Sequence, residues 1–293
     1  MSPRKWLLAL PAALLTAVLT GTQAQADTAP TGHAVAATGV QAHRLAAPVV
    51  PSVVPSVTPS GVAKPQATCW FGACYEYASA AQVATNGGAS VTTTVQQPEL
   101  DRHDSSAHSL QELAVMTTDR AFIVEIGWII YPGLNGDSAP HLFVYHWVNN
   151  GESCYNGCGF VSTTSAAGPG MALTPNTSVG LAIQSYSGNW WLSYNGTWIG
   201  YFPGSLWNNA YSQANEIQAF GEVSSTSGTT CTDMGNGRWG SDGASSSFSN
   251  LQLLGSTASP SWGVSQTDPS HYTVGSATKT SFHLGGPGSG SCG

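Results

Sequence analysis

Two glutamates lie in stretches of sequence that otherwise resemble buried β-strands. Glu125 is in the middle of FIVEIGWII, and Glu222 follows Phe220 and Gly221 in IQAFGEV. A carboxylate in an apolar run must be paired, protonated or part of a functional site, because burying it alone is costly. Two such carboxyls on neighbouring strands could do acid and base chemistry. The ionised one would activate a water molecule, and the protonated one would polarise a carbonyl or protonate a leaving group.

Strand alternation predicts which residues share a face with each glutamate. It places Gly127 beside Glu125, and Gln218 and Phe220 beside Glu222. A nearby glycine leaves room for a ligand or another backbone, and Gln218 is a candidate oxyanion donor. The structural alternative is that each glutamate caps a sheet edge or pairs with an arginine, although the chain has only 8 basic residues.

The elements that would carry these residues are short strands. Only 8% of the residues are charged, against roughly 25% in an average soluble domain, and there are 34 glycines. Apolar runs bounded by Gly, Pro, Asn and Asp predict strands at 121–131, 141–148, 179–185, 190–194, 197–202 and 217–223. Only 206–215 favours a helix. We expect an all-β fold, an antiparallel β-sandwich of the jelly-roll-like kind.

The first 67 residues differ in composition from the rest. Arg4 and Lys5 precede an apolar run that ends before small residues at 24–26, which predicts a signal peptide over 1–26 and a secreted, extracellular protein. Residues 27–67 are rich in Pro, Ala and Thr and form a low-complexity linker or pro-segment.

One domain is expected over 68–293. We expect a monomer without membrane contact after signal cleavage. The net charge of −7 and the absence of a basic run argue against nucleic acid.

Six cysteines follow the predicted cleavage site, and in an oxidising compartment they favour disulfides. Their spacing allows two local loops, Cys69 with Cys74 and Cys154 with Cys158, and one longer link, Cys231 with Cys292. Sequence alone cannot choose among the possible connectivities. Zinc sites need paired CxxC or His ligands, and that spacing does not occur. We therefore expect no metal and no cofactor.

Eight blocks in the same order resemble the neprosin domain of secreted proteins over about residues 67–254. They are EIGW from Glu125, Tyr131-Pro, LNGD from Leu134, HLFVYHW, CYNGCGFV from Cys154, NWWL from Asn189, GYFP from Gly200, and FGEV from Phe220. The resemblance implies a secreted glutamic peptidase on an antiparallel β-sandwich, which cleaves polypeptides after proline at acidic pH. It places the catalytic pair at Glu125 and Glu222, and it supports the Cys154–Cys158 disulfide.

The resemblance also has departures and leaves alternatives. The second motif usually has two glycines before its glutamate, whereas Phe220 precedes a single Gly221 here. A pocket for proline would need flat apolar walls, for which Trp128, Trp191 and Tyr201 are candidates. A glycoside hydrolase also uses two carboxylates. A non-catalytic module that binds carbohydrate or a surface would keep the aromatic residues and need neither glutamate.

Overall fold

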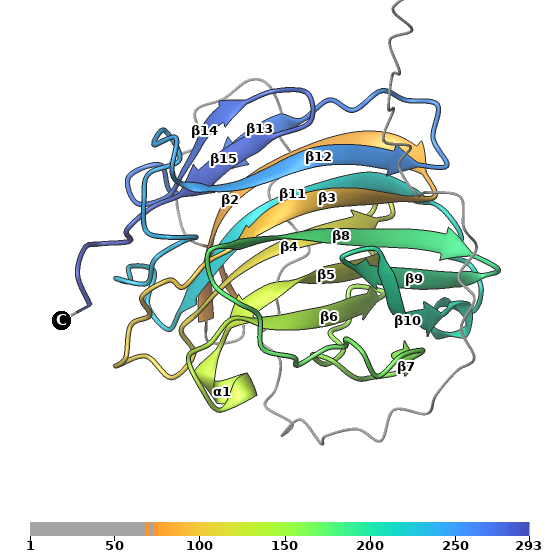
Figure 1. Cartoon of the computed structure of the whole chain (residues 1–293), viewed down its shortest axis with the longest axis horizontal. Coiled ribbons are helices and arrows are strands. Elements are labelled where there is room, and N and C mark those ends of the chain that lie inside the picture. Colours follow the sequence, from red (N-terminus) through yellow and green to blue (C-terminus); the bar gives the residue numbers. More distant parts are fainter. Residues whose placement is uncertain (1–67, 71–72, 293) are drawn as a thin grey trace, which may run out of the picture.

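The computed structural model describes residues 68–70 and 73–292. The predicted signal peptide (1–26) and low-complexity segment (27–67) lie outside these residues, so both stay predictions. The described chain forms two antiparallel sheets, which Figure 1 shows stacked face to face. The predicted antiparallel β-sandwich is confirmed.

The first sheet carries both glutamates of the predicted pair. Its strands, in spatial order, are β1 (Thr68–Trp70), β2 (Ala73–Asn86), β11 (Ala214–Ser225), β4 (His108–Met116), β5 (Phe122–Ile130) and β6 (His141–Val148), and β13 (Gly263–Gln266) also pairs with β2. Consecutive strands β4, β5 and β6 are neighbours, whereas β11 inserts between β2 and β4. This insertion brings a late segment of the chain next to an early one.

The second sheet covers one face of the first. Its strands, in spatial order, are β14 (Thr273–Ala277), β15 (Phe282–Gly285), β12 (Ser246–Leu254), β3 (Gly88–Val95), β8 (Thr177–Tyr186), β9 (Asn189–Tyr194), β10 (Thr197–Pro203) and β7 (Val161–Ser162). All six predicted strand segments lie within observed strands or overlap them closely. A short helix, α1 (Pro132–Asn135), was not predicted; one residue separates it from the end of β5.

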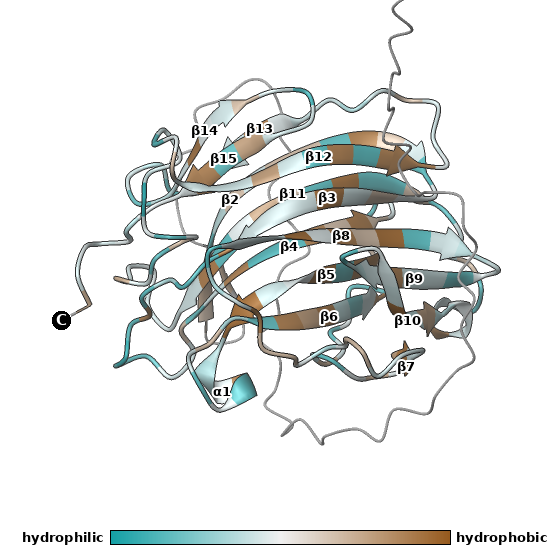
Figure 2. Cartoon of the chain, in the orientation of Figure 1, coloured by the Kyte–Doolittle hydropathy of each residue, from teal (hydrophilic) through white to brown (hydrophobic). Residues whose placement is uncertain are grey.

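The main core lies between the two sheets. Val124, Ile126 and Trp128 of β5 belong to the same buried cluster as Leu181 and Ile183 of β8. Figure 2 shows the hydrophobic residues as brown bands along the strands, while the connecting loops are mostly pale or teal. Each fully buried aliphatic side chain stabilises the fold by about 1.5–3 kcal/mol.

A second buried cluster lies on the opposite, outer face of the first sheet. It contains residues of β2, β4, β5, β6 and β11 together with Tyr155 from the loop after β6. Glu125 and Glu222 lie on this outer face, which we call the glutamate face. The first sheet is therefore buried on both sides, which explains why its strands have almost continuous apolar runs.

The helix predicted at 206–215 is wrong. The chain forms a short 3-10 turn, η1 (Gly204–Trp207), and then turns toward β11. Asn208 and Asn209 both have positive φ angles, 51° and 60°, which a right-handed helix cannot include. Trp207 is buried and its indole Nε1 donates to the Trp147 carbonyl at 2.7 Å, so tertiary packing holds the turn.

Three disulfides join the pairs that the spacing allowed: Cys69–Cys74, Cys154–Cys158 and Cys231–Cys292. The last spans 61 residues and ties the C-terminal segment to the loop after β11. A cross-link over a longer loop restricts the unfolded chain more strongly.

Across residues 68–70 and 73–292, no helix is long and apolar enough to cross a membrane.

Candidate active site

Three neighbouring strands position the predicted catalytic pair. Glu125 in β5 is opposite Ala114 in β4, and Ala114 is opposite Gln218 in β11. Glu222, farther along β11, is opposite Leu110 in β4. Alternation along each strand puts all five side chains on the glutamate face, although the two glutamates lie on strands that are not adjacent. The pair is thus carried by β5 and β11, with β4 between them.

A third glutamate, Glu112, lies on β4 between the other two. It is opposite Gly127 on one side and Phe220 on the other, so it occupies the row between those of Glu125 and Glu222. The exposed fractions are 3% for Glu112, 5% for Glu125 and 0% for Glu222. Three buried carboxyls therefore follow a diagonal across the face.

Neither Glu112 nor its strand, β4, is among the elements expected from the sequence. Gln111 and Glu112 are adjacent polar residues, so they interrupt the apolar run of HSLQELAVM. The signal that could have found Glu112 is its alternation with Leu110 and Ala114, which places it on the same face as these apolar residues.

Gly127 makes the close approach of β4 possible. A Cβ at this position would lie 2.3 Å from the Gln111 carbonyl oxygen and 2.7 Å from Cβ of Glu112. Any side chain here would push β4 away at the point where it carries Glu112. The glycine in the EIGW block therefore has a packing role in assembling the three carboxyls.

Burial and mutual repulsion keep two of these carboxyls protonated. Burial raises the pKa of Glu125 to about 8, a hydrogen bond from Trp147 Nε1 at 3.0 Å opposes this rise, and the charge of Glu222 adds to it. Burial also raises the pKa of Glu112 well above its ordinary value, and the charges of Glu125 and Glu222 raise it further. Carboxyls that raise one another's pKa disfavour ionising together.

Glu222 has a different environment, because it has an imidazole partner. His108 Nε2 lies 2.8 Å from Glu222 Oε1, and both side chains are completely buried. His108 Nδ1 lies 2.8 Å from Ser224 Oγ, and the Ser224 hydroxyl donates to the Ser106 carbonyl at 2.7 Å. A buried imidazole thus lies at the Glu222 end of the diagonal, against the carboxyl of Glu222.

The family model of neprosin matches residues 105–287, which is more than half of the chain and includes all three glutamates. The chain belongs to the neprosin family.

Some solved structures are similar to this chain, at low sequence identity. Scytalido-glutamic peptidase with a peptide-based transition-state analogue has a TM-score of 0.42 and 12% identity, over 71% of this chain and 97% of that one. The eqolisin-family peptidase SCP-B, in complex with the tripeptide Ala-Ile-His, has a TM-score of 0.34 and 11% identity, over 71% and 96%. CG-16, a homodimeric agglutinin from chicken liver, has a TM-score of 0.30 and 11% identity, over 50% and 93%. Since all three TM-scores lie below 0.5, the functional argument rests on the site and the family.

Phe220 of this neprosin occupies the position where the family motif usually has a glycine. Its ring is on the glutamate face and meets Tyr77 edge to face, with ring centroids 5.7 Å apart. Gly221 points to the opposite side, where a Cβ would lie 2.5 Å from Leu284 Cδ1. The departure therefore adds an aromatic wall beside Glu112, while the remaining glycine is required by the core.

Tyrosines surround the three carboxyls of the neprosin. Tyr75, Tyr77, Tyr145 and Tyr155 are all buried in the glutamate-face cluster. Burial raises the pKa of Tyr77 well above its ordinary value, and the charge of Glu222 raises it further. These hydroxyls stay protonated, so they are neutral donors around the acidic groups.

Gln218 and Glu125 are both opposite Ala114, but the side chain of Gln218 already makes a hydrogen bond within the protein. Its amide nitrogen donates to Glu216 Oε1 at 2.7 Å, and Arg120 Nη2 lies 2.7 Å from the same oxygen. Gln218 would have to exchange this bond to donate to a substrate. The predicted oxyanion role of Gln218 stays untested.

The structure does not place the three predicted aromatic pocket residues near the glutamates. Trp128 is on the opposite face of β5, in the main core, where its Nε1 donates to the Thr94 carbonyl at 3.0 Å. Trp191 and Tyr201 contact each other on β9 and β10 of the second sheet, with ring centroids 4.7 Å apart. Because Trp190 and Phe202 beside them point into the core, these two rings point away from it. Their assignment to a pocket beside the glutamates is wrong.

The arrangement can perform proton transfers in both directions. It combines two carboxyls whose pKa values are raised by burial with one that lies against an imidazole, in a site removed from water. Among the residues that the structure describes, no group of three His, Cys, Asp or Glu side chains could hold a metal ion.

Proposed function

We propose that this neprosin is a secreted glutamic endopeptidase that cleaves after proline at acidic pH. The observation that carries the proposal is the convergence of three buried carboxyls on one sheet face, with Glu125 and Glu112 held protonated and Glu222 beside an imidazole. The resemblance of the EIGW and FGEV blocks to the family's catalytic motifs supports the same pair. The three disulfides support secretion, because such bonds persist in oxidising compartments.

In the proposed mechanism, Glu222 is the general base. Ionised Glu222 takes a proton from a water molecule as the hydroxyl attacks the scissile carbonyl carbon. Protonated Glu125 donates a hydrogen bond to the developing oxyanion and then a proton to the leaving amine. A pKa of about 8 keeps Glu125 protonated throughout the acidic range, as this role requires.

The preference for proline needs apolar walls next to the carboxyls. Aromatic side chains of the glutamate face supply them, and the edge-to-face pair of Tyr77 and Phe220 lies in the rows of Glu222 and Glu112. We assign the wall that contacts the proline ring to this pair. The CH₂ groups of a pyrrolidine ring are apolar, so the ring packs well against aromatic faces.

The test incubates the purified full chain with an unfolded, proline-containing protein from pH 3 to pH 8, and mass spectrometry identifies the cleavage sites. Glu125→Gln and Glu222→Gln should each lower kcat by about 10²–10⁴-fold. The control is Glu152→Gln, which changes an exposed glutamate and should leave cleavage unchanged.

Each outcome bears on a different part of the proposal. Cuts after proline that are lost in both site variants support it. Cuts after other residues would keep the peptidase and overturn the specificity. No cleavage at any pH, or cleavage that both site variants retain, would refute the peptidase and favour a glycoside hydrolase or a binding module.

A further inference from the structure

We propose that His108 is a buried imidazolium that keeps Glu222 ionised at acidic pH, and so sets the lower pH limit of activity. This inference rests on the proposed function, because it assigns a positioning residue to the proposed base. His108 does not touch the substrate in this scheme; it acts through Glu222.

The hydrogen bonds of His108 determine where its protons lie. The Ser224 hydroxyl has one hydrogen, and that hydrogen goes to the Ser106 carbonyl at 2.7 Å, because a carbonyl can only accept. Ser224 Oγ must then accept from His108 Nδ1 at 2.8 Å. Nδ1 therefore carries a hydrogen, and its lone pair is not available.

The remaining proton lies between His108 Nε2 and Glu222 Oε1, which are 2.8 Å apart. If Nε2 also carries a hydrogen, the ring is an imidazolium and Glu222 is a carboxylate. An imidazole ordinarily holds its second proton to a pH about two units higher than a carboxylic acid does. The proton therefore resides on His108, and the pair is an ion pair without net charge.

The groups around His108 do not compete for this proton. On β2, the Tyr75 ring lies 6.3 Å from the imidazole, and Tyr131, which follows β5, lies 5.2 Å away, measured between ring centroids. Burial raises the pKa of both phenols, so both stay neutral. On its own strand, His108 is followed on the same face by Leu110 and then Glu112, which burial keeps protonated.

Asp104 is a charged group near this end of the face, and its charge adds to the effect of burial in raising the pKa of Tyr131. Its Oδ1 accepts hydrogen bonds from Ser106, and its Oδ2 accepts from Thr226, so its negative charge is held by other donors. Hydrogen bonding from these residues lowers the pKa of Asp104 overall, although burial opposes the effect.

As a consequence, Glu222 can act as a base at a pH at which an unpaired carboxylate would take up a proton. Activity falls on the acidic side when Glu222 becomes protonated. A neighbouring positive charge moves that event to lower pH. Without the imidazolium, Glu222 would share its face with two other carboxyls and would take up a proton at higher pH.

The kinetic test compares pH profiles of kcat for the full chain, His108→Gln and Ser224→Ala. In His108→Gln, the pH below which kcat falls (the acidic limb of the profile) should rise by at least one unit, and full activity should return at higher pH. Ser224→Ala removes the acceptor of Nδ1 and should move the limb in the same direction by less. The matched control His103→Gln changes an exposed histidine and should leave the limb in place.

A spectroscopic test does not depend on activity. Nitrogen-15 NMR of the histidine rings in the Glu125→Gln variant should show both ring nitrogens of His108 protonated from pH 4 to pH 7, with the signals identified by their loss in His108→Gln. If His108→Gln does not fold, Glu222→Gln identifies the ring instead, because His108 should then lose its second proton at lower pH.

The two tests separate this inference from the proposed function. A chain without peptidase activity but with a doubly protonated His108 would refute the function and leave the ion pair supported. An active chain whose acidic limb is unchanged in His108→Gln, or whose His108 is a single neutral tautomer at pH 5, would overturn the role of His108.

Discussion

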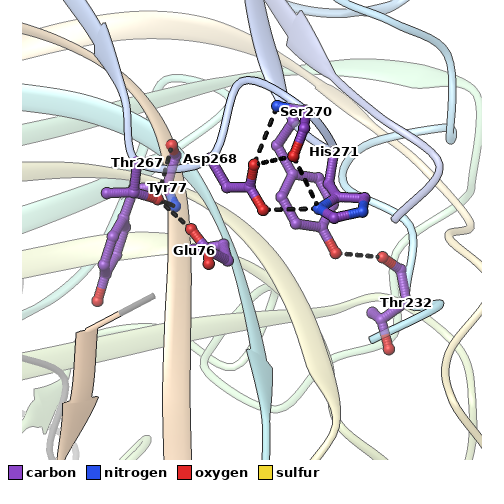
Figure 3. A network of polar contacts seen from close by, with 8 residues as sticks. Glu76, Tyr77, Thr232, Thr267, Asp268, Ser270 and His271 are labelled. Carbon is purple, nitrogen blue, oxygen red and sulfur yellow. Dashed lines mark hydrogen bonds and ion pairs between the residues drawn. The ribbon is translucent and has the colours of Figure 1, made fainter. Parts of the chain in front are cut away.

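A buried glutamate on the other face of the first sheet makes the fold itself sensitive to pH. Glu76 on β2 is only 5% exposed, and Thr267 Oγ1 donates to its Oε2 at 2.5 Å. The backbone N–H of Tyr77 donates to the same Thr267 oxygen at 2.8 Å, and Asp268 lies beside the group and pairs with His271 (Figure 3). Burial raises the pKa of Glu76 to about 7, with the hydrogen bond from Thr267 opposing it.

The sign of the effect follows from proton binding. Between pH 4.5 and about 7 the folded chain holds a proton on Glu76 that the unfolded chain has lost. Stability is therefore full below pH 4.5 and declines as the pH rises through about 7. Each pH unit costs about 1.4 kcal/mol, so over this window the free energy of unfolding should fall by about 3 kcal/mol.

The perturbation is Glu76→Gln, which keeps the size of the side chain and cannot ionise. Urea unfolding is followed from pH 4 to pH 8 in a Glu125→Gln background, which prevents self-cleavage and removes one further carboxyl whose raised pKa would contribute. Relative to its parent, the Glu76→Gln chain should gain about 3 kcal/mol between pH 4 and pH 8. Glu152→Gln is the matched control at an exposed glutamate.

The reasoning fails if the difference between Glu76→Gln and its parent changes by less than about 1 kcal/mol over that range. Glu76 would then be ionised in the folded chain at neutral pH. An equal change in Glu152→Gln would show that net charge, and not the buried group, governs the pH dependence.

Three further predictions concern the site and its support. Trp147→Phe removes the donor to ionised Glu125, so the pKa of Glu125 should rise and the alkaline limb of kcat should move up by about one pH unit; an unchanged limb would exclude Glu125 as the acid. Arg120→Met leaves buried Glu216 without its ion pair and should lower the free energy of unfolding in urea by about 3 kcal/mol, and a loss below 1 kcal/mol would contradict this. Gly221→Ala places a Cβ 2.5 Å from Leu284 and should lower stability by about 1–3 kcal/mol; an unchanged melting temperature would show that Leu284 moves freely.

Part of the site could be predicted because strand alternation is a local property. A glutamate inside FIVEIGWII shares a face with Gly127 in any sheet that the segment joins, and the observed register agrees. The same alternation shows that Trp128, three residues from Glu125, must point the other way. Its assignment to the pocket could therefore have been corrected without a structure.

The partners of the glutamates could not be predicted, because they depend on which strands pair. Nothing local requires β4 to lie between β5 and β11, a pairing of segments about a hundred residues apart. That placement alone brings Glu112 between the predicted pair and His108 against Glu222. The helix expected at 206–215 failed for a related reason, since buried Trp207 and the left-handed Asn208 and Asn209 follow the packing and not the local pattern.

The sequence by itself determined a β-rich chain in which a few glutamates had to share buried surface with almost no basic residues to neutralise them. Its apolar runs, glycines and cysteine spacing are local features, and local features decide which segments become strands. The tertiary structure alone decided the charge of each carboxyl. A carboxyl's protonation depends on every group within a few ångströms, and strand order, which arises from packing across the whole sheet, decides which groups those are.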